Sequence, residues 1–302
     1  MLQPLSDGQY SKVDSESQYN SQNGLLSATG CSQTDFLYLY EDRWFYSQEI
    51  VKKRILARLG RFRSLFARKC IVVAVDGGIC RETNGGNVYN GVSDGDIKEF
   101  IGRFHSYGYA KCKYRYALVY GGEIVAAASF SASRPMPREV MVNSCAETRI
   151  YDSYEWVRYV SLPDVRVVGG MGRLLKAFLK DIDSRRKSFR TPVLEYEEIS
   201  LNPIEVMSYS DEEWSAGEVY RSLGFVEVAR REPVLYYVDK MSYERLSYRK
   251  LMMRMKQEQS SFSADAQVVE ECEGFENLLQ SGDCRYYTIK NKGSRKFLLQ
   301  LP

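Results

Sequence analysis

Histidine is almost absent from this chain, because His105 is the only one among 302 residues. A metal site built from several histidines is therefore excluded, and only a mixed site with carboxylates such as Asp211 stays open. Cysteines with metal-ligand spacing are also missing, since no two are separated by two residues. The cysteine count of seven is odd, so we expect a protein of a reducing compartment without a disulfide framework.

Long apolar runs and a large charge of one sign are lacking too. No stretch approaches the roughly 18 apolar residues of a membrane-spanning helix, and the N-terminus has neither the basic nor the apolar region of a signal peptide. The net charge is only +3, with 44% hydrophobic and 27% charged residues. This composition is typical of globular proteins. We therefore expect a soluble, cytoplasmic protein without membrane contact, and the sequence leaves its oligomeric state open.

Composition and patterning divide the chain into five stretches. The first is rich in Ser, Gln, Asn and Gly and is expected to be a disordered tail. The second combines a basic helix with a strand and a glycine-rich loop, and the third alternates helix and strand patterns. A polar linker and a C-terminal strand hairpin follow. The boundaries are 1–34, 35–94, 95–250, 251–275 and 276–302.

The third stretch predicts a mixed αβ sheet. Gly121-Gly122 separates two apolar runs and predicts a hairpin. Because helices alternate with strands in the second half of this stretch, part of the sheet is expected to be parallel. The expected helices are 95–106 after an Asp94 cap, 170–183, and a helix that Ser210 or Asp211 caps and Gly224 ends. The expected strands are 114–120, 123–131, 153–161, 204–209, 226–229 and 234–239, with a polar loop at 184–202.

A glycine cluster follows the strand 153–161 and opens the helix 170–183. Glycine lets the backbone approach a ligand closely, and the first helical turn has N–H groups without intrahelical partners at the positive end of the dipole. The alternative is a tight turn that needs glycine for packing, with a solvated arginine after it. The residues predicted to bind a phosphate or pyrophosphate are Arg166, Gly169, Gly170, Met171, Gly172 and Arg173.

This order of elements resembles the Gcn5-related N-acetyltransferase (GNAT) fold. In that family a segment R/Q-x-x-G-x-G/A turns from the fourth strand into the third helix and holds the pyrophosphate of coenzyme A, and Arg166–Gly172 matches its first glycine. A tyrosine four residues before Gly-Phe often protonates the leaving thiolate, and Tyr220 stands there before Gly224-Phe225. The resemblance implies an α/β fold with a central mixed sheet flanked by helices, acetyl-CoA or another acyl-CoA as donor, and an amine acceptor.

Further segments are similar to phage-type GNAT-like proteins, a branch that looks related to the Mom DNA-modification enzymes, which alter adenine bases. These segments are Phe104–Gly108, Tyr116–Phe130, Val167–Lys176, Ser208–Ser215 and Pro233–Tyr237, and the resemblance covers about 95–250. Two features depart from the branch. Met171 stands where a small polar residue is common, and the stretch 184–202 is longer than usual. Both leave the identity of the donor open.

The candidate catalytic residues are His105, Asp211 and Tyr220. An imidazole titrates near neutrality, so His105 either takes a proton from an attacking amine or is a hydrogen-bonded residue at a helix end. Asp211 is either a helix cap or a base that accepts from an amine. Tyr220 is either part of a core or a general acid. Glu155 and Arg158 are expected on opposite faces of their strand.

Two basic regions are candidates for nucleic-acid contacts. Residues 43–69 predict a basic amphipathic helix, and Arg245–Lys256 adds tyrosines to its cations. In both regions the alternative is a solvated helix face. Arg245 and Arg249 would contact phosphates, while the tyrosine rings of this region would stack on an extruded base. Ser215 is a third predicted substrate contact.

The function predicted from these features is a GNAT-like N-acyltransferase that moves an acyl group from acyl-CoA to an amine. One alternative is a Mom-like enzyme whose acceptor is a DNA or RNA base. Another is a catalytically silent GNAT-like module that binds a partner.

Overall fold

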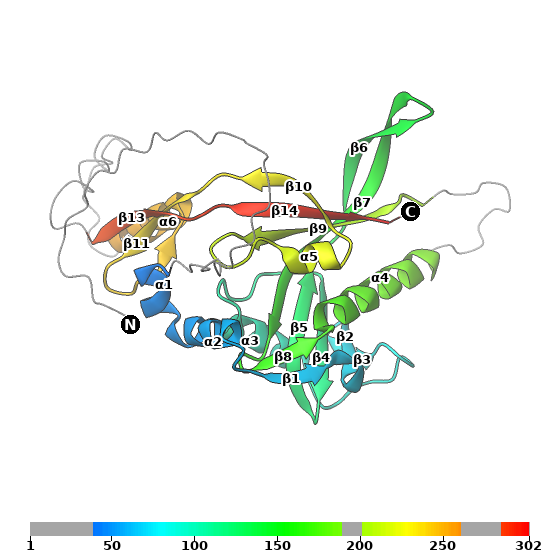
Figure 1. Ribbon diagram of the computed structural model, residues 1–302, viewed down its shortest axis with the longest axis horizontal. Coiled ribbons are helices and arrows are strands. Elements are labelled where there is room, and N and C mark those ends of the chain that lie inside the picture. The colour runs from blue at the N-terminus through cyan, green and yellow to red at the C-terminus, as the bar shows by residue number, and fades with distance from the viewer. Residues whose placement is uncertain (1–38, 189–200, 261–284, 302) are drawn as a thin grey trace, which may run out of the picture. The chain divides into compact units, whose positions relative to one another are not determined.

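A large mixed sheet carries helices on both of its faces in the computed structural model, which describes residues 39–188, 201–260 and 285–301 (Figure 1). The predicted tail at 1–34 lies outside the described residues. So do most of the predicted loop at 184–202 and most of the linker at 251–275. The described residues belong to one compact unit. Within the described part, no helix is both long and apolar enough to span a bilayer.

Nine strands form the main sheet. They are β2 (Ile71–Asp76), β3 (Ile79–Glu82), β4 (Tyr114–Tyr120), β5 (Glu123–Phe130), β6 (Arg134–Val142), β7 (Cys145–Ser161), β9 (Ile204–Asp211), β10 (Val226–Arg231) and β14 (Ser294–Gln300). Their order is β10-β14-β9-β7-β5-β4-β2-β3, and β6 pairs with β7. The β7–β9 pair is parallel and the other pairs are antiparallel. A mixed sheet was predicted, and this pairing confirms it.

Smaller elements surround the sheet. β1 (Arg63–Phe66) pairs in parallel with β8 (Val165–Val168), and β11 (Leu235–Asp239) lies between β12 (Arg245–Leu246) and β13 (Tyr286–Lys290). The helices are α1 (Glu41–Tyr46), α2 (Gln48–Arg58), α3 (Asp94–Phe104), α4 (Gly170–Ser188), α5 (Glu218–Ser222) and α6 (Tyr248–Ser260). The single basic helix predicted at 43–69 is therefore two helices and a strand, because Gly60 at φ +72° ends the helical stretch.

The helix α3 begins one residue earlier than predicted, because Ser93 rather than Asp94 caps it. The Ser93 hydroxyl accepts the N–H of Asp96 at 3.1 Å, and the Asp96 carboxylate accepts the N–H of Ser93 at 2.7 Å. This capping box satisfies two backbone donors that the helix itself leaves without partners. The helix then buries Ile97 and Ile101 completely against one face of the sheet.

Alternation along the central strands supplies a core on each face. Ala126, Ala128 and Phe130 of β5 pack on the α4 side, and Ala127 packs on the α3 side. The rings of Phe130 and Phe178 stack with centroids 3.9 Å apart. Small residues on β5 thus let both helices approach closely, and burying a side chain such as Phe178 contributes about 1.5–3 kcal/mol.

The two parallel strands separate toward one end of the sheet. β7 and β9 pair over Asp152–Glu155 and Ile204–Met207. On its other side β9 pairs with β14 from Glu205 to Asp211, while β7 continues along β5 from Trp156 to Ser161. The backbones of two neighbouring strands therefore diverge in the middle of the sheet, which opens space between them.

Two strand assignments differ from the sequence prediction. The C-terminal segments were expected to form a hairpin, but β13 pairs with β11 and β14 lies between β9 and β10. Strand β6 was not predicted, because Pro135 and Pro137 argue against a strand. They are tolerated because β6 pairs with β7 and its other edge stays unpaired within the described structure.

Candidate functional site

A cleft of about 460 Å³ lies where β7 and β9 separate. Its walls include all three predicted catalytic residues, which come from different elements: His105 from the end of α3, Asp211 from the end of β9, and Tyr220 from α5. Met171, at the start of α4, lines it as well. The fold thus brings together residues that are more than 100 positions apart in the sequence.

Tyr220 lies at the point where the strands part. The Ser208 hydroxyl of β9 is 2.9 Å from the Tyr220 oxygen and 3.1 Å from the Trp156 carbonyl of β7, so it spans the opening. Ser208 has one hydroxyl proton. If it donates that proton to the Trp156 carbonyl, which can only accept, it receives the proton of Tyr220; if it donates to Tyr220 instead, the phenol keeps its own proton for another partner. Burial raises the pKa of Tyr220 while the Ser208 contact opposes that shift. The phenol is therefore protonated at neutral pH.

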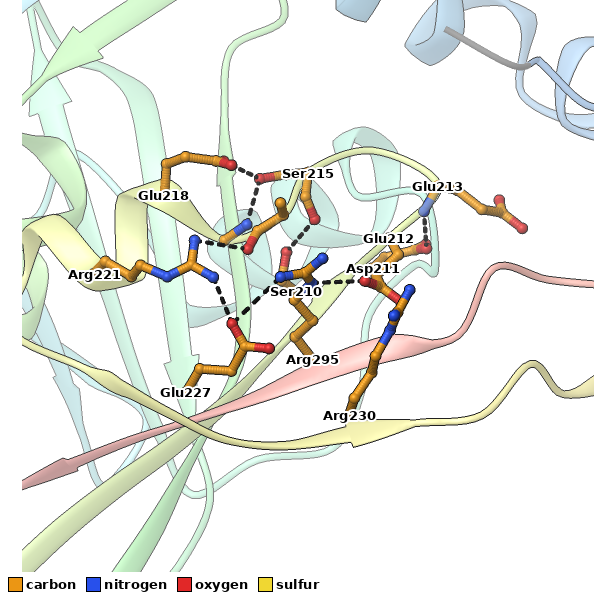
Figure 2. Close-up of polar contacts among 12 residues, drawn as sticks. Ser210, Asp211, Glu212, Glu213, Ser215, Glu218, Arg221, Glu227, Arg230 and Arg295 are labelled. Atoms are coloured by element: carbon orange, nitrogen blue, oxygen red, sulfur yellow. Dashed lines mark hydrogen bonds and ion pairs between the residues drawn. The ribbon is translucent and has the colours of Figure 1, made fainter. Parts of the chain in front are cut away.

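Asp211 is held by two donors. The Tyr107 hydroxyl donates to Asp211 Oδ2 at 2.5 Å, and the Glu213 N–H donates to Oδ1 at 3.0 Å (Figure 2 shows the second contact). Tyr107 in turn accepts from Arg43 Nη2 at 2.8 Å. Each carboxylate oxygen of Asp211 retains a further lone pair, so the group can still accept a proton.

The turn after β9 replaces the helix start that was predicted at Ser210 or Asp211. The Ser210 hydroxyl donates to the Ser215 carbonyl at 2.7 Å, and Ser215 Oγ accepts the N–H of Gly217 at 3.0 Å (Figure 2). Helix α5 starts only at Glu218, after Gly217 at φ +88°. Ser215 lines the cleft, and its hydroxyl is engaged in this turn.

His105 follows α3 with a defined ring orientation. Its Nδ1 accepts the backbone N–H of Tyr107 at 3.1 Å, so in the neutral ring the proton is on Nε2. Burial, followed by the charges of Arg158 and Arg54, lowers the pKa of His105 to about 3. At neutral pH His105 therefore carries an N–H donor at Nε2. In the described part of the chain, no three His, Cys, Asp or Glu residues are grouped to hold a metal ion.

A β-bulge corrects one prediction about the cleft. Ser129 of β5 is opposite Arg158, while the next residue, Phe130, is opposite Trp156, so Val157 is the extra residue on β7. The bulge brings Glu155 and Arg158 onto the same face, and both line the cleft. The sequence spacing placed them on opposite faces because it assumed an uninterrupted pleat.

Packing explains the glycines that open α4. Gly169 has φ +75°, a Cβ on Gly170 would lie 2.8 Å from the Tyr159 hydroxyl oxygen, and one on Gly172 would lie 3.1 Å from Leu223 Cδ2. The first helical hydrogen bond runs from the Arg173 N–H to the Gly169 carbonyl at 3.0 Å. The Arg173 side chain donates to the Ala67 carbonyl at 2.6 Å. Phosphate binding by this turn stays a prediction.

A cationic groove of about 450 Å³ adjoins the cleft. Arg54, His105 and Tyr159 line both of them. The groove adds three cationic residues and two aromatic residues from α2, α3 and the segments around β1 and β8, which are Lys53, Arg58, Arg166, Phe62 and Phe104. The Arg166 guanidinium carbon lies 5.4 Å from the Phe62 ring centroid. Arg166 is the one predicted phosphate ligand that lines this groove.

Buried ion pairs connect α1 to the turn after β9. Arg245 binds Asp42 and also donates to Glu213 Oε1 at 2.6 Å. Arg43 donates to the other oxygen of Glu213 at 3.1 Å. Their side chains are at most 8% exposed. The predicted basic face therefore divides: Arg245 lies inside the protein, and Arg249 is exposed on α6.

Sequence reasoning did not identify Tyr107, Arg54 or Arg43 as site residues. Tyr107 lies in the motif Phe104–Gly108, so its neighbour His105 was a signal for it. Arg54 and Arg43 are in a segment predicted to be an extension, and nothing local in the sequence shows that Arg54 lines the cleft or that Arg43 contacts Tyr107.

Comparison with known proteins gives a loose likeness. No protein-family model and no curated protein matches the chain. One solved structure that it is similar to is described as a Bacillus subtilis acetyltransferase in complex with CoA. The two share 13% sequence identity with a TM-score of 0.28, over 63% of this chain and 77% of that one. The resemblance to the Mom-like branch stays a prediction.

Proposed function

We propose that this protein is a GNAT-like N-acyltransferase that transfers an acyl group from acyl-CoA to an amine. The observation that carries the proposal is the position of Tyr220 at the opening between β7 and β9, in one cleft with His105 and Asp211. A protonated phenol and a carboxylate in a shared cleft supply the acid and the base that aminolysis of a thioester requires.

The cleft and the cationic groove together suit a long donor with a charged end. The diphosphate of the donor is assigned to the groove and no longer to the glycine turn at 169–172, because Lys53, Arg58 and Arg166 supply positive charge there and the glycines of the turn do not line it. The thioester is assigned to the cleft near Tyr220. Tyr159, which lines both cavities, marks the path between them.

The chemistry then needs two proton transfers. The amine nitrogen attacks the thioester carbon, the new C–N bond forms, and the amine proton passes to Asp211. The C–S bond breaks, and the departing thiolate takes the proton of Tyr220. His105 holds its proton on Nε2, so its proposed role is to donate a hydrogen bond to the thioester oxygen as negative charge develops there. Solvent exchange returns both carboxylate and phenol to their starting states.

A third cavity offers a route for the acceptor. It has a volume of about 630 Å³, and His105 and Tyr107 line it together with Tyr46, Tyr236 and Tyr243. It therefore meets the cleft at His105 from another side. We assign the amine to this cavity because Tyr107, which lines it, donates to the Asp211 carboxylate.

The test is turnover of acetyl-CoA with a panel of amines. The rate is measured from the free thiol of coenzyme A that the reaction releases. Tyr220→Phe is expected to lower kcat about a hundredfold or more, because positioned general acids contribute that much. Tyr120→Phe removes a phenol from the exposed end of β4 and serves as the control. Equal rates in the two variants would rule out Tyr220 as the acid.

A nucleic-acid base is a second candidate acceptor, and the tyrosines of the 630 Å³ cavity favour it because flat rings stack on extruded bases. Binding of a short DNA or RNA strand should then weaken steeply with salt. Replacement of the exposed Arg249 by Gln should reduce that salt dependence.

A further inference from the structure

Buried and half-buried arginines of this protein commonly face carboxylates. Arg43 pairs with Glu213, Arg115 with Asp94, and Arg138 with Glu205. Such pairing offsets the large cost of removing a charge from water. Two half-buried arginines that line the 460 Å³ cleft, Arg54 and Arg158, are different. Within residues 39–188, 201–260 and 285–301, neither forms an ion pair with a carboxylate.

Both guanidinium groups contact neutral partners instead. Arg54 donates to Ser106 Oγ at 3.2 Å, and its guanidinium carbon lies 4.4 Å from the Trp214 ring centroid. Arg158 donates to the carbonyls of Gly108 at 3.0 Å and Val157 at 2.8 Å. A guanidinium has five N–H donors, so these contacts leave donors of each group for a ligand.

The acidic residues near the two arginines are engaged elsewhere. Asp211, which interacts electrostatically with Arg54, accepts from Tyr107 and from the Glu213 N–H. Glu155, on the same face as Arg158, pairs with Arg134 at 3.3 Å. The cleft therefore holds two cations whose burial lowers their pKa values, and an anion between them would offset that burial.

We propose that Arg54 and Arg158 together bind an anionic group, a carboxylate or a phosphate, which the acceptor carries close to its amine. This inference rests on the proposed function and specifies its acceptor as an anionic amine. The anion is assigned to the acceptor because both arginines line the cleft with Asp211, the group that takes the amine proton. Arg54 also lines the groove, so Arg158, which lines the cleft and not the groove, assigns the anion to the acceptor; Lys53, Arg58 and Arg166 line the groove and not the cleft.

His105 gives a direct reporter of the site. His105 lines the cleft together with Arg54 and Arg158, and the charges of both arginines lower the pKa of its ring. A bound anion would partly cancel those charges and stabilise the imidazolium. Because the chain has one histidine, its ring signals in an NMR spectrum belong to His105 without further assignment. Full-length protein is enough for the measurement.

The experiment titrates the protein with sodium phosphate and, separately, with sodium acetate at constant ionic strength. We expect the His105 signals to move along a saturable curve with one of the two anions, and the pKa of His105 to rise by about one unit at saturation. The anion that binds more tightly identifies the acceptor group as phosphate or carboxylate. Signals that do not move with either anion would overturn the proposal.

Substitutions of the two arginines test whether the anion binds between them. Arg54→Met is expected to weaken anion binding about tenfold or more, because a charge-assisted contact is lost. Arg61→Met removes an exposed arginine just beyond α2 and should leave the curve unchanged. Arg158→Met is the second variant if Arg54→Met does not fold. Equal affinities in Arg54→Met, Arg158→Met and Arg61→Met would show that the anion binds elsewhere.

The outcome separates this inference from the proposed function. If coenzyme A binds and neither anion shifts His105, the acyltransferase proposal stands and the anionic acceptor is wrong. If an anion binds through Arg54 and coenzyme A does not, the anion site stands and the donor assignment fails.

Discussion

The hydroxyl of Tyr107 joins Asp211 to Arg43, because it donates to Asp211 Oδ2 at 2.5 Å and accepts from Arg43 Nη2 at 2.8 Å. Arg43 belongs to α1, and it also binds Glu213 in the turn after β9. Burial raises the pKa of Tyr107, so the phenol stays protonated and keeps donating to the carboxylate. An N-terminal helix thereby helps to position the candidate base.

Tyr107→Phe should break this connection. One partner of a charged hydrogen bond is lost, so we expect the free energy of unfolding to fall by about 1–3 kcal/mol and kcat to fall with it. Urea denaturation and turnover with acetyl-CoA measure the two effects. Tyr109→Phe is the control, since among the described residues its hydroxyl contacts only Cys112 Sγ, at a distance of 3.9 Å. A Tyr107→Phe variant as active as Tyr109→Phe would show that Asp211 needs no positioning.

His105 should make stability depend on pH in acid. Its pKa is about 3 in the folded chain, against an ordinary value of 6.5. Between these values the unfolded chain binds the extra proton, so stability is full above pH 6.5 and falls as the pH is lowered toward 3. Protonation of His105 in the unfolded chain lowers the free energy of unfolding by up to about 1.4 kcal/mol per pH unit in this range. His105→Gln should flatten the pH dependence of the urea midpoint between pH 7 and pH 5, and a profile identical to the wild type would contradict the assignment.

Arg245 and Arg249 should differ sharply in their effect on stability. Arg245→Met leaves Asp42 and Glu213 buried without their shared cation, and we expect a loss of about 3–5 kcal/mol. Arg249→Met changes an exposed residue on α6 and should stay within about 0.5 kcal/mol of the wild type. Denaturant unfolding of both variants decides the matter. Similar losses would mean that the buried ion pairs do not hold α1 in place.

Gly170→Ala should destabilise the start of α4 through one contact. The added methyl group would lie 2.8 Å from the Tyr159 hydroxyl oxygen, and such overpacking costs about 1–3 kcal/mol. Tyr159→Phe removes that oxygen, so the double variant should recover part of the loss in a double-mutant cycle. If the losses of stability in the two single variants add up in the double variant, the contact with Tyr159 is not the reason for the glycine at position 170.

Local patterns in the sequence predicted much of the sheet. The hairpin of β4 and β5 forms at Gly121-Gly122, where both glycines have positive φ, as the two apolar runs indicated. The helix α4 was predicted from its apolar face and extends five residues beyond the expected end, to Ser188. These features depend on neighbours within a few positions, which is why single-sequence patterns detect them.

The pairing of strands that are far apart in the chain was not predicted from the sequence. The insertion of β14 between β9 and β10 joins residues about 60–95 positions apart, and nothing in the segment Lys296–Leu301 specifies those partners. The bulge at Val157 and the ion pair of Asp42 with Arg245 are likewise set by tertiary contacts. His105, Asp211 and Tyr220 were proposed together from a family resemblance, and the separation of β7 from β9 supplies the shared cleft.

Calorimetric titration of the full chain with acetyl-CoA tests the central claim most directly. The account predicts one binding site per chain, an affinity about tenfold weaker in Arg166→Met because a cation of the groove is lost, and an unchanged affinity in Arg61→Met. Absence of binding by the wild type, or equal affinities in the two variants, would contradict an acyl-CoA donor held in the groove beside the cleft.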